Sequence, residues 1–144
     1  MSHLPVDHPL RGFYRGLALL TGVGLIAFGI AGWIQTSSLS FFDQSGKTVL
    51  YLSTNPAFSV LSLVVGIGVL IATVVGRNLD VATNTALGAV FILAGLVMLC
   101  VIRTDANYLA SSVRNVNVSF VVGMLLLSHG LYGRVSRHRP RVTA

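Results

Sequence analysis

The sequence contains few charged residues that could face water. It contains no glutamate, its four acidic residues are all aspartate, and charged residues make up 10% of its 144 positions, whereas a soluble domain carries roughly 25%. Hydrophobic residues make up 53%, and the mean hydropathy is +0.79. This balance excludes an ordinary water-soluble globule, and it also excludes a disordered chain, which needs high charge and low hydrophobicity. The sequence therefore predicts one small integral membrane domain.

Chemically reactive groups are also scarce. Cys100 is the single cysteine, so no intramolecular disulfide and no CxxC site can form. Because it lies in an apolar run, its thiol is expected to behave as a small hydrophobic side chain. The aspartates fall in predicted tails and loops, and neither a Ser-His-Asp set nor a glycine-rich phosphate loop is present. His3 and His8 stand beside Asp7 in a short tail that offers no fixed geometry for a metal. The sequence predicts a protein that is not an enzyme, with no catalytic residue, no cofactor and no metal site.

Four apolar runs approach the length of about 20 residues that crosses a bilayer. Backbone polar groups must be paired internally in lipid, so these runs are predicted to be helices. The predicted fold class is all-α, an integral membrane four-helix bundle. The expected helices cover residues 16–34, 57–75, 81–102 and 116–132 of a transmembrane domain (16–132), between an N-terminal tail (1–15) and a basic C-terminal tail (133–144).

The basic residues predict how the chain sits in the membrane. Seven Lys and Arg residues fall in the N-terminal tail, the link between the second and third helices, and the C-terminal tail, whereas three fall in the other two links. By the positive-inside rule, this distribution places both termini in the cytoplasm of a multi-pass protein of the bacterial plasma membrane. Because the basic residues flank apolar runs, no nucleic acid partner is expected. The C-terminal arginines either contact anionic lipid headgroups or serve only as a topological anchor; they are Arg134, Arg137, Arg139 and Arg141.

Small residues recur four positions apart in the predicted helices. This spacing lets two helix backbones approach closely in lipid, where hydrophobicity does not drive association. Packing inside the bundle explains the spacing, and so does docking to another membrane subunit or a second copy of the chain, so both explanations stay open. The candidate positions are Gly12 and Gly16, Ala18 and Gly22, Ser62 and Gly66, and Ser119 and Gly123.

His129 is the one histidine inside a predicted span. An ionisable residue at membrane depth is a functional candidate, through proton relay or ligation. The alternative is a neutral histidine at the interface, close to Arg134 and water, which only makes a hydrogen bond. No acidic partner accompanies His129 on its own helix, and this favours the second explanation.

The second and fourth predicted helices share a pattern. The second opens with Asn55-Pro-Ala-Phe-Ser59 and reaches Val64-Val65-Gly66, and the fourth opens with Asn115-Val-Asn-Val-Ser119 and reaches Val121-Val122-Gly123. Both follow an outer link and both run inward. The pattern predicts two related helical hairpins in parallel orientation, with the Val-Val-Gly three residues nearer the serine in the second copy.

On these residues the chain resembles a small four-helix membrane family of unknown function that is common in actinobacteria. The resemblance covers most of residues 11–133. The family carries an Asn followed by His and a Gly at the start of helices two and four. Here Phe58 and Ser62 in one copy and Ser119 in the other stand in place of the histidines. The resemblance implies the four-helix fold and a membrane location, and it implies that any activity carried by those histidines is lost.

Two functions fit this set of features. The first is a non-catalytic accessory or structural subunit of a larger plasma-membrane complex, such as a respiratory assembly or lipid-export machinery, with membrane lipids and other subunits or a second copy as partners. The alternative is a small transporter or lipid-binding membrane protein with a cavity between the hairpins. A cleft that reaches Thr21, Ser62 or Ser119 would favour the alternative, and a closed, dry bundle would disfavour it.

Overall fold

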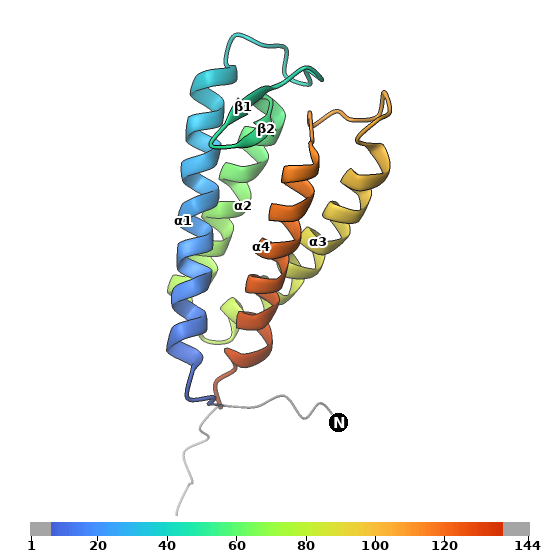
Figure 1. The fold of residues 1–144 in the computed structure, drawn as a ribbon. Helices are drawn as coiled ribbons and strands as arrows, with labels where there is room; N and C mark the ends of the chain where they lie inside the picture. Colours follow the sequence, from blue (N-terminus) through green and yellow to red (C-terminus); the bar gives the residue numbers. More distant parts are fainter. Residues whose placement is uncertain (1–6, 137–144) are drawn as a thin grey trace, which may run out of the picture.

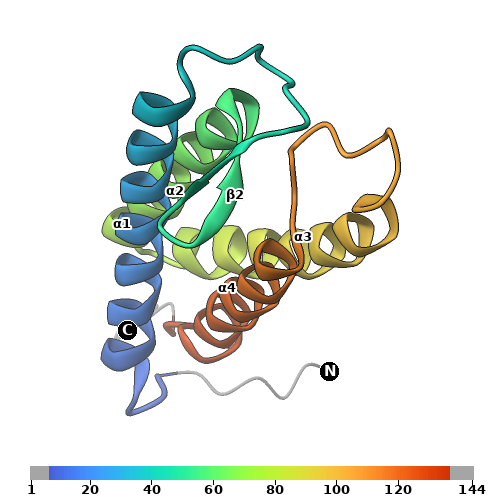
Figure 2. The same cartoon turned by 45° about the horizontal axis from the view of Figure 1, so that its top comes forward.

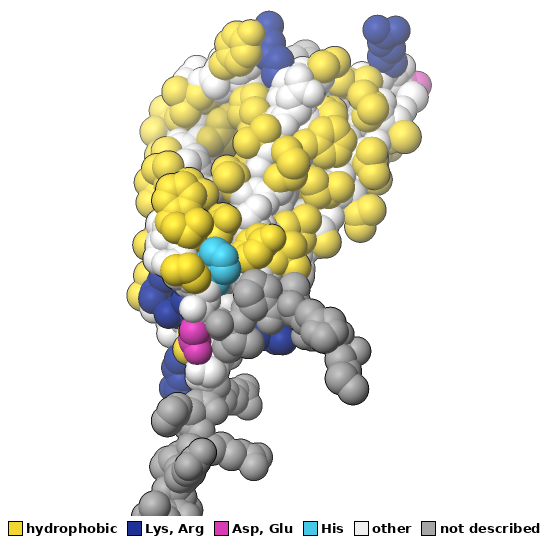
Figure 3. Space-filling model, turned by 60° about the horizontal axis from the view of Figure 1, so that its bottom comes forward, with side chains coloured by type: hydrophobic (Ala, Val, Ile, Leu, Met, Phe, Trp, Pro, Cys, Tyr) yellow, Lys and Arg dark blue, Asp and Glu magenta, His cyan; other side chains and the backbone are white. Residues whose placement is uncertain are grey.

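A computed structural model of the chain describes residues 7–136 and contains four long helices. Each helix is long and apolar enough to cross a membrane, and large hydrophobic side chains are exposed on all of them. Hydrophobic side chains cover the flank of the molecule, with Lys and Arg near its ends (Figure 3). The prediction of an all-α, multi-pass membrane four-helix bundle is confirmed. The helices are α1 (Arg11–Thr36), α2 (Pro56–Val75), α3 (Leu79–Val101) and α4 (Val113–Tyr132).

Three of the helices begin earlier than their apolar runs. Helix α1 begins at Arg11, α3 at Leu79 and α4 at Val113, because polar residues extend each helix beyond the hydrocarbon core. In α4, Ser112 and Asn115 form a capping box that pairs the first free N–H groups of the helix. The polar first turns therefore belong to the helices and not to the connecting loops.

Glycines bring the helices together as two hairpins, α1–α2 and α3–α4. A Cβ atom on Gly66 would lie 2.9 Å from the carbonyl oxygen of Gly22, and one on Gly123 would lie 2.9 Å from that of Gly88. Each helix pair is thus in backbone contact, as small residues allow. The start of α1 and the end of α4 lie at one end of the bundle, here called the terminal end, and the α1–α2 and α3–α4 connections lie at the other, the loop end (Figure 1).

The two hairpins repeat the same contacts. An isoleucine of the first helix covers the glycine of the second in both, Ile26 against Gly66 and Ile92 against Gly123. One turn after the glycine of the second helix, a leucine lies against a glycine of the first helix in both hairpins, Leu70 against Gly22 and Leu127 against Gly88. Equivalent positions are Gly22 and Gly88, Ile26 and Ile92, and Gly29 and Gly95 in the first helices, and Ser62 and Ser119, Gly66 and Gly123, and Leu70 and Leu127 in the second helices.

This register corrects the sequence alignment of the two copies. The sequence pattern paired Ser119 with Ser59, but the glycine contacts pair Ser119 with Ser62 and leave no three-residue offset at Val-Val-Gly. Asn55 accordingly corresponds to Ser112, since these two residues cap α2 and α4. The alignment was wrong because it matched residue identity, whereas the close approach of the helices sets the register.

The hairpins pack together mainly near the terminal end. Ala18, Val69 and Leu126, from three different helices, are fully buried there in one apolar cluster. From this contact α3 leans away from α2 toward the loop end (Figure 1). The short α2–α3 link turns through Gly76, Arg77 and Asn78, whose φ angles of 65°, 55° and 66° are left-handed. The helices of the two hairpins are therefore in contact near the terminal end and separate toward the loop end.

The α1–α2 connection covers the loop end. It forms an antiparallel pair of strands, β1 (Lys47–Val49) and β2 (Leu52–Thr54). Val49 is 1% exposed and Thr54 is fully buried, so one face of the pair packs on the bundle. Figure 2 shows this pair and the α3–α4 loop over the same end of the molecule.

Asn55 joins the two loops. Its Nδ2 donates to the carbonyl oxygens of Asp43, at 2.9 Å, and Tyr108, at 2.8 Å, and its Oδ1 accepts from the Phe58 N–H at the start of α2. The side chain is fully buried. The Ser45 hydroxyl and nearby amides donate to the Asp43 carboxylate, and these hydrogen bonds hold the pKa of Asp43 below its usual range.

Asn55→Ala is expected to lower the free energy of unfolding by about 2 kcal/mol, because it removes a helix cap and leaves buried carbonyl groups without a donor. Asn117→Ala is the control, since Asn117 is exposed on α4. Both variants are compared with the parent chain by unfolding in detergent, followed by circular dichroism. Equal effects of the two replacements would contradict this role for Asn55.

Candidate functional site

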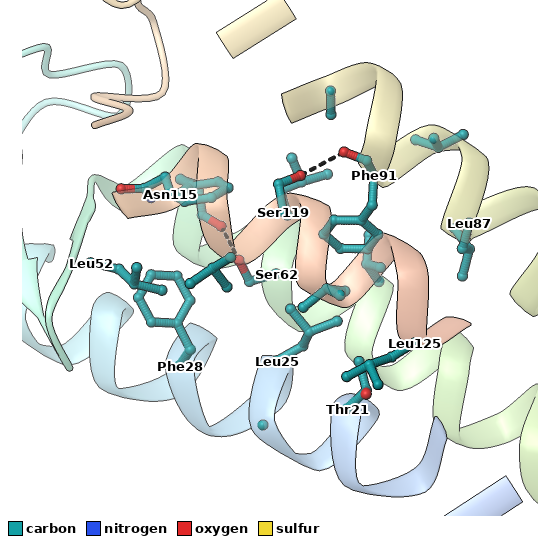
Figure 4. A pocket seen from close by; sticks show the side chains of 18 of the residues that line it. Thr21, Leu25, Phe28, Leu52, Ser62, Leu87, Phe91, Asn115, Ser119 and Leu125 are labelled. Atoms are coloured by element: carbon teal, nitrogen blue, oxygen red, sulfur yellow. Dashed lines mark hydrogen bonds between the residues drawn. The ribbon is translucent and has the colours of Figure 1, made fainter. Parts of the chain in front are cut away.

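A cavity of about 420 Å³ lies between the two hairpins. All four helices and β2 line it, and its wall is mostly aliphatic and aromatic. The volume falls in the range of roughly 300–1,000 Å³ that is typical of small-molecule sites. Its polar side chains are Thr21, Ser62, Asn115 and Ser119 (Figure 4). The cleft thus reaches the three hydroxyl residues that were expected to distinguish a binding protein from a closed bundle.

The hydroxyl groups on the wall already donate their protons. Thr21 donates to the Leu17 carbonyl at 2.8 Å, Ser62 donates one turn back in its own helix at 2.8 Å, and Ser119 donates across to the carbonyl of Phe91 at 2.6 Å. Among the described residues that line the cavity, none carries a charge. The wall can therefore accept a weak hydrogen bond, but it offers no counter-charge to an ion.

The cavity is closed at both ends of the bundle and reaches its flank. The buried cluster around Val69 and Leu126 packs against its wall on the side of the terminal end. On the other side, Asn115 Oδ1 accepts a hydrogen bond from the Ser53 backbone N–H at 3.1 Å, and Asn115 Nδ2 donates one to the Ser53 carbonyl at 2.7 Å. Wall residues at the rim are exposed, for example Leu20 (68%). The cavity is therefore reached from the hydrocarbon region that surrounds the helices.

A second polar site lies outside the cavity, at the terminal end. His129 and Asp80 are both fully buried, and His129 Nε2 lies 3.2 Å from Asp80 Oδ2. One expectation was wrong: Asp80 is not in a loop but in the first turn of α3. His129 is fully buried and makes a hydrogen bond. The partner was missed because it comes from another helix. An aspartate just ahead of an apolar run is itself a signal for a helix N-terminus, where its charge is favoured.

Two more residues extend this pair toward α2. The Nδ2 of Asn84 donates to the Oγ1 of Thr73 at 3.3 Å, and both side chains are fully buried. We call Asp80, His129, Asn84 and Thr73 the polar cluster. Three of its buried atoms have no hydrogen-bond partner: Asp80 Oδ1, Asn84 Oδ1 and His129 Nδ1.

Two members of the polar cluster, Asn84 and His129, have apolar counterparts in the first hairpin. By the register of the repeat, Asn84 corresponds to Ala18 and His129 corresponds to Ala72. Both alanines are buried, at 0% and 4% exposed. The first hairpin thus keeps the same sites apolar, so the bundle does not need polar residues there in order to pack.

Two arginines of α1 donate hydrogen bonds to backbone carbonyl groups at the terminal end. Arg11 Nε donates to the Gly133 carbonyl at 3.0 Å, and Arg15 donates to the Val74 carbonyl at 3.1 Å. These carbonyls belong to the ends of α4 and α2, whose last turns lack partners inside the helix. The predicted lipid-contact residues follow: Arg134 is exposed, and Arg137, Arg139 and Arg141 lie outside the described residues.

The small residues divide into three groups. Gly22, Gly66 and Gly123 hold helices together inside the hairpins, and Ala18 is part of the buried core. Ser62 and Ser119 face the cavity. A Cβ atom on Gly12 or Gly16 would meet no atom within 4 Å, so these two positions lie open on α1. The structure therefore leaves only this pair free for docking.

Cys100 is exposed on the flank of α3, in keeping with a side chain that contacts lipid. Within residues 7–136, no three His, Cys or acidic side chains gather in a way that could hold a metal ion. The remaining site is the cavity, together with the polar cluster beneath it.

No curated protein and no solved structure matches the sequence. A protein-family model matches residues 15–132, a segment that contains the cavity wall and the polar cluster. This agrees with the resemblance to a family of unknown function. The chain therefore belongs to the family described as the domain of unknown function DUF4383.

Proposed function

We propose that this protein binds the apolar chain of a membrane lipid in the cavity between its hairpins. The observation that carries the proposal is an uncharged cavity of about 420 Å³ at membrane depth, bounded by all four helices. On α1 the wall runs from Leu17 to Phe28, a distance of roughly 16 Å at 1.5 Å per residue. A space of this length and polarity fits an acyl or isoprenoid chain.

The polarity of the wall argues against ion transport. A conducting path needs charged or strongly polar groups along its length. Here the hydroxyls of Thr21, Ser62 and Ser119 have their protons engaged with backbone carbonyls. The ligand supported by this chemistry is a neutral hydrocarbon chain that enters sideways from the bilayer.

The proposed setting is the plasma membrane of a bacterium, with both termini in the cytoplasm. Arg11, Arg15, Arg77 and Arg134 belong to the terminal end, whereas Lys47, Arg103 and Arg114 belong to the loop end. The excess of basic residues at the terminal end supports this orientation.

Filling the cavity is expected to abolish binding. Gly24 lines the cavity, and a Cβ atom there would meet nothing within 4 Å, so Gly24→Trp places a bulky ring in the open space. We expect the purified protein to retain one dioleoylglycerol molecule in native mass spectrometry and Gly24→Trp to retain it at least tenfold less.

Gly68→Trp is the matched control, because Gly68 is equally uncrowded but does not line the cavity. It is expected to bind like the parent chain. Failure of the parent chain to retain the lipid, or equal retention by both tryptophan variants, would overturn the proposal.

The accessory-subunit hypothesis remains a second proposal, and the open surface at Gly12 and Gly16 favours it. If α1 docks on a larger membrane subunit through these glycines, Gly16→Leu should release the chain from a complex that the parent chain forms in native electrophoresis of solubilised membranes. Gly68→Leu should not do so. Migration of the parent chain as a lone monomer would count against this proposal.

A further inference from the structure

We propose that Asp80 and His129 form a proton-binding site that is reached from the terminal end of the bundle. The site is independent of the lipid cavity: none of its residues lines that cavity, and the proposal stands if lipid binding fails. The incoming proton binds to His129 Nδ1, while Nε2 keeps its hydrogen bond to Asp80 Oδ2.

The geometry leaves one nitrogen available. His129 Nε2 is paired with the carboxylate at 3.2 Å, but His129 Nδ1 is buried and has no hydrogen-bond partner among residues 7–136. A Cβ atom on Gly133 would lie 3.2 Å from Nδ1, so this edge of the ring faces the last residue before the C-terminal segment. Gly133 precedes Arg134, which is exposed at the terminal end, so we infer that the proton reaches Nδ1 from this side.

The buried carboxylate of Asp80 favours the binding of a proton to His129. With a neutral imidazole, an ionised Asp80 leaves one uncompensated negative charge in a fully buried place, which is costly. A hydronium ion that transfers its proton to Nδ1 leaves as water and converts the ring to imidazolium. The buried pair then carries one positive and one negative charge in direct contact.

Every neighbouring helix contributes to this balance. From α1, the charges of Arg11 and Arg15 act on His129 and oppose the bound proton, whereas Asp80 on α3 favours it. Helix α2 supplies Thr73, which is uncharged, and α3 also supplies the Asn84 amide, which contacts Thr73. Burial of the ring opposes the charged imidazolium most strongly, so the occupancy of the site depends on whether the Asp80 carboxylate offsets both this burial and the two guanidinium groups.

The apolar cluster prevents the proton from crossing the bundle. Ala18, Val69 and Leu126 are fully buried and pack directly against cavity-wall residues. The site binds and returns a proton on one side and is not a relay through the membrane.

The test is an NMR titration of the full chain, labelled with ¹⁵N-histidine, in lipid nanodiscs. His129→Asn identifies the His129 ring signals by their loss. We expect these signals to report binding of one proton within the pH range in which the fold is retained. Asp80→Asn should weaken proton binding at least tenfold, because it removes the favourable charge.

Arg11→Gln is the second variant, and it remains informative even if Asp80→Asn does not fold. Glutamine keeps an N–H donor for the Gly133 carbonyl but removes the opposing charge, so proton binding should strengthen about twofold to fivefold. Arg114→Gln, at the loop end, should leave the midpoint unchanged. His129 signals that never titrate, or a midpoint unaffected by Asp80→Asn and by Arg11→Gln, would overturn the proposal.

Discussion

Replacement of Gly66 with leucine is expected to destabilise the protein by about 3 kcal/mol, because the new side chain would force α1 and α2 apart. Its first carbon alone would lie 2.9 Å from the Gly22 carbonyl oxygen and 2.8 Å from a side-chain carbon of Ile26. Backbone cannot move out of the way without shifting the whole hairpin. Thermal unfolding in detergent, followed by circular dichroism, measures the loss.

Gly68→Leu is the matched control on the same helix. A Cβ atom there meets nothing within 4 Å, so the replacement is expected to change stability by less than about 1 kcal/mol and to gain helix propensity. Because Gly123 is equivalent to Gly66 in the repeat, Gly123→Leu is expected to destabilise the second hairpin as Gly66→Leu destabilises the first. If Gly66→Leu and Gly68→Leu unfold at the same temperature, the hairpins are not held by backbone contact.

Asp80→Ala is expected to lower stability by about 3–5 kcal/mol, because it leaves buried His129 without its partner. The double variant Asp80→Ala with His129→Ala is expected to lose about 2 kcal/mol less than the sum of the two single variants, since neither buried side chain is then left without its partner. At position 129 it also matches the first hairpin, where the equivalent residue is the buried Ala72. Unfolding free energies of the four proteins in one detergent complete the cycle.

Ser128→Ala serves as the control on α4, because the Ser128 hydroxyl is exposed and bonds only to its own helix. Its effect should stay within about 0.5 kcal/mol. Strict additivity of the two single replacements would mean that the 3.2 Å contact does not couple Asp80 to His129.

The helices could be predicted from sequence because crossing a bilayer requires a long apolar run and nothing else. The same reasoning misplaced the first turn of α3, since Asp80 looks like a loop residue when only hydropathy is read. The pairing of Asp80 with His129 depends on how α3 and α4 are rotated against each other. That rotation is set by glycine contacts such as Gly88 against Gly123, which local sequence does not encode.

The cavity could be predicted only in part. Thr21, Ser62 and Ser119 were chosen as hydroxyls at membrane depth, and all three line it. Its existence depends on the separation of the hairpins toward the loop end, which follows from packing at Ala18, Val69 and Leu126. Small residues likewise gave the correct spacing but could not show which of them face inward.

The repeated glycine contacts also bear on how such a chain arises. Two hairpins with equivalent contacts and parallel topology are what results when one gene for a two-helix protein duplicates and fuses. The ancestor would have worked as a homodimer, in which any polar substitution appeared twice around the axis. Fusion removes that constraint, and the alanines of one half opposite Asn84 and His129 of the other record a divergence that a homodimer could not have made.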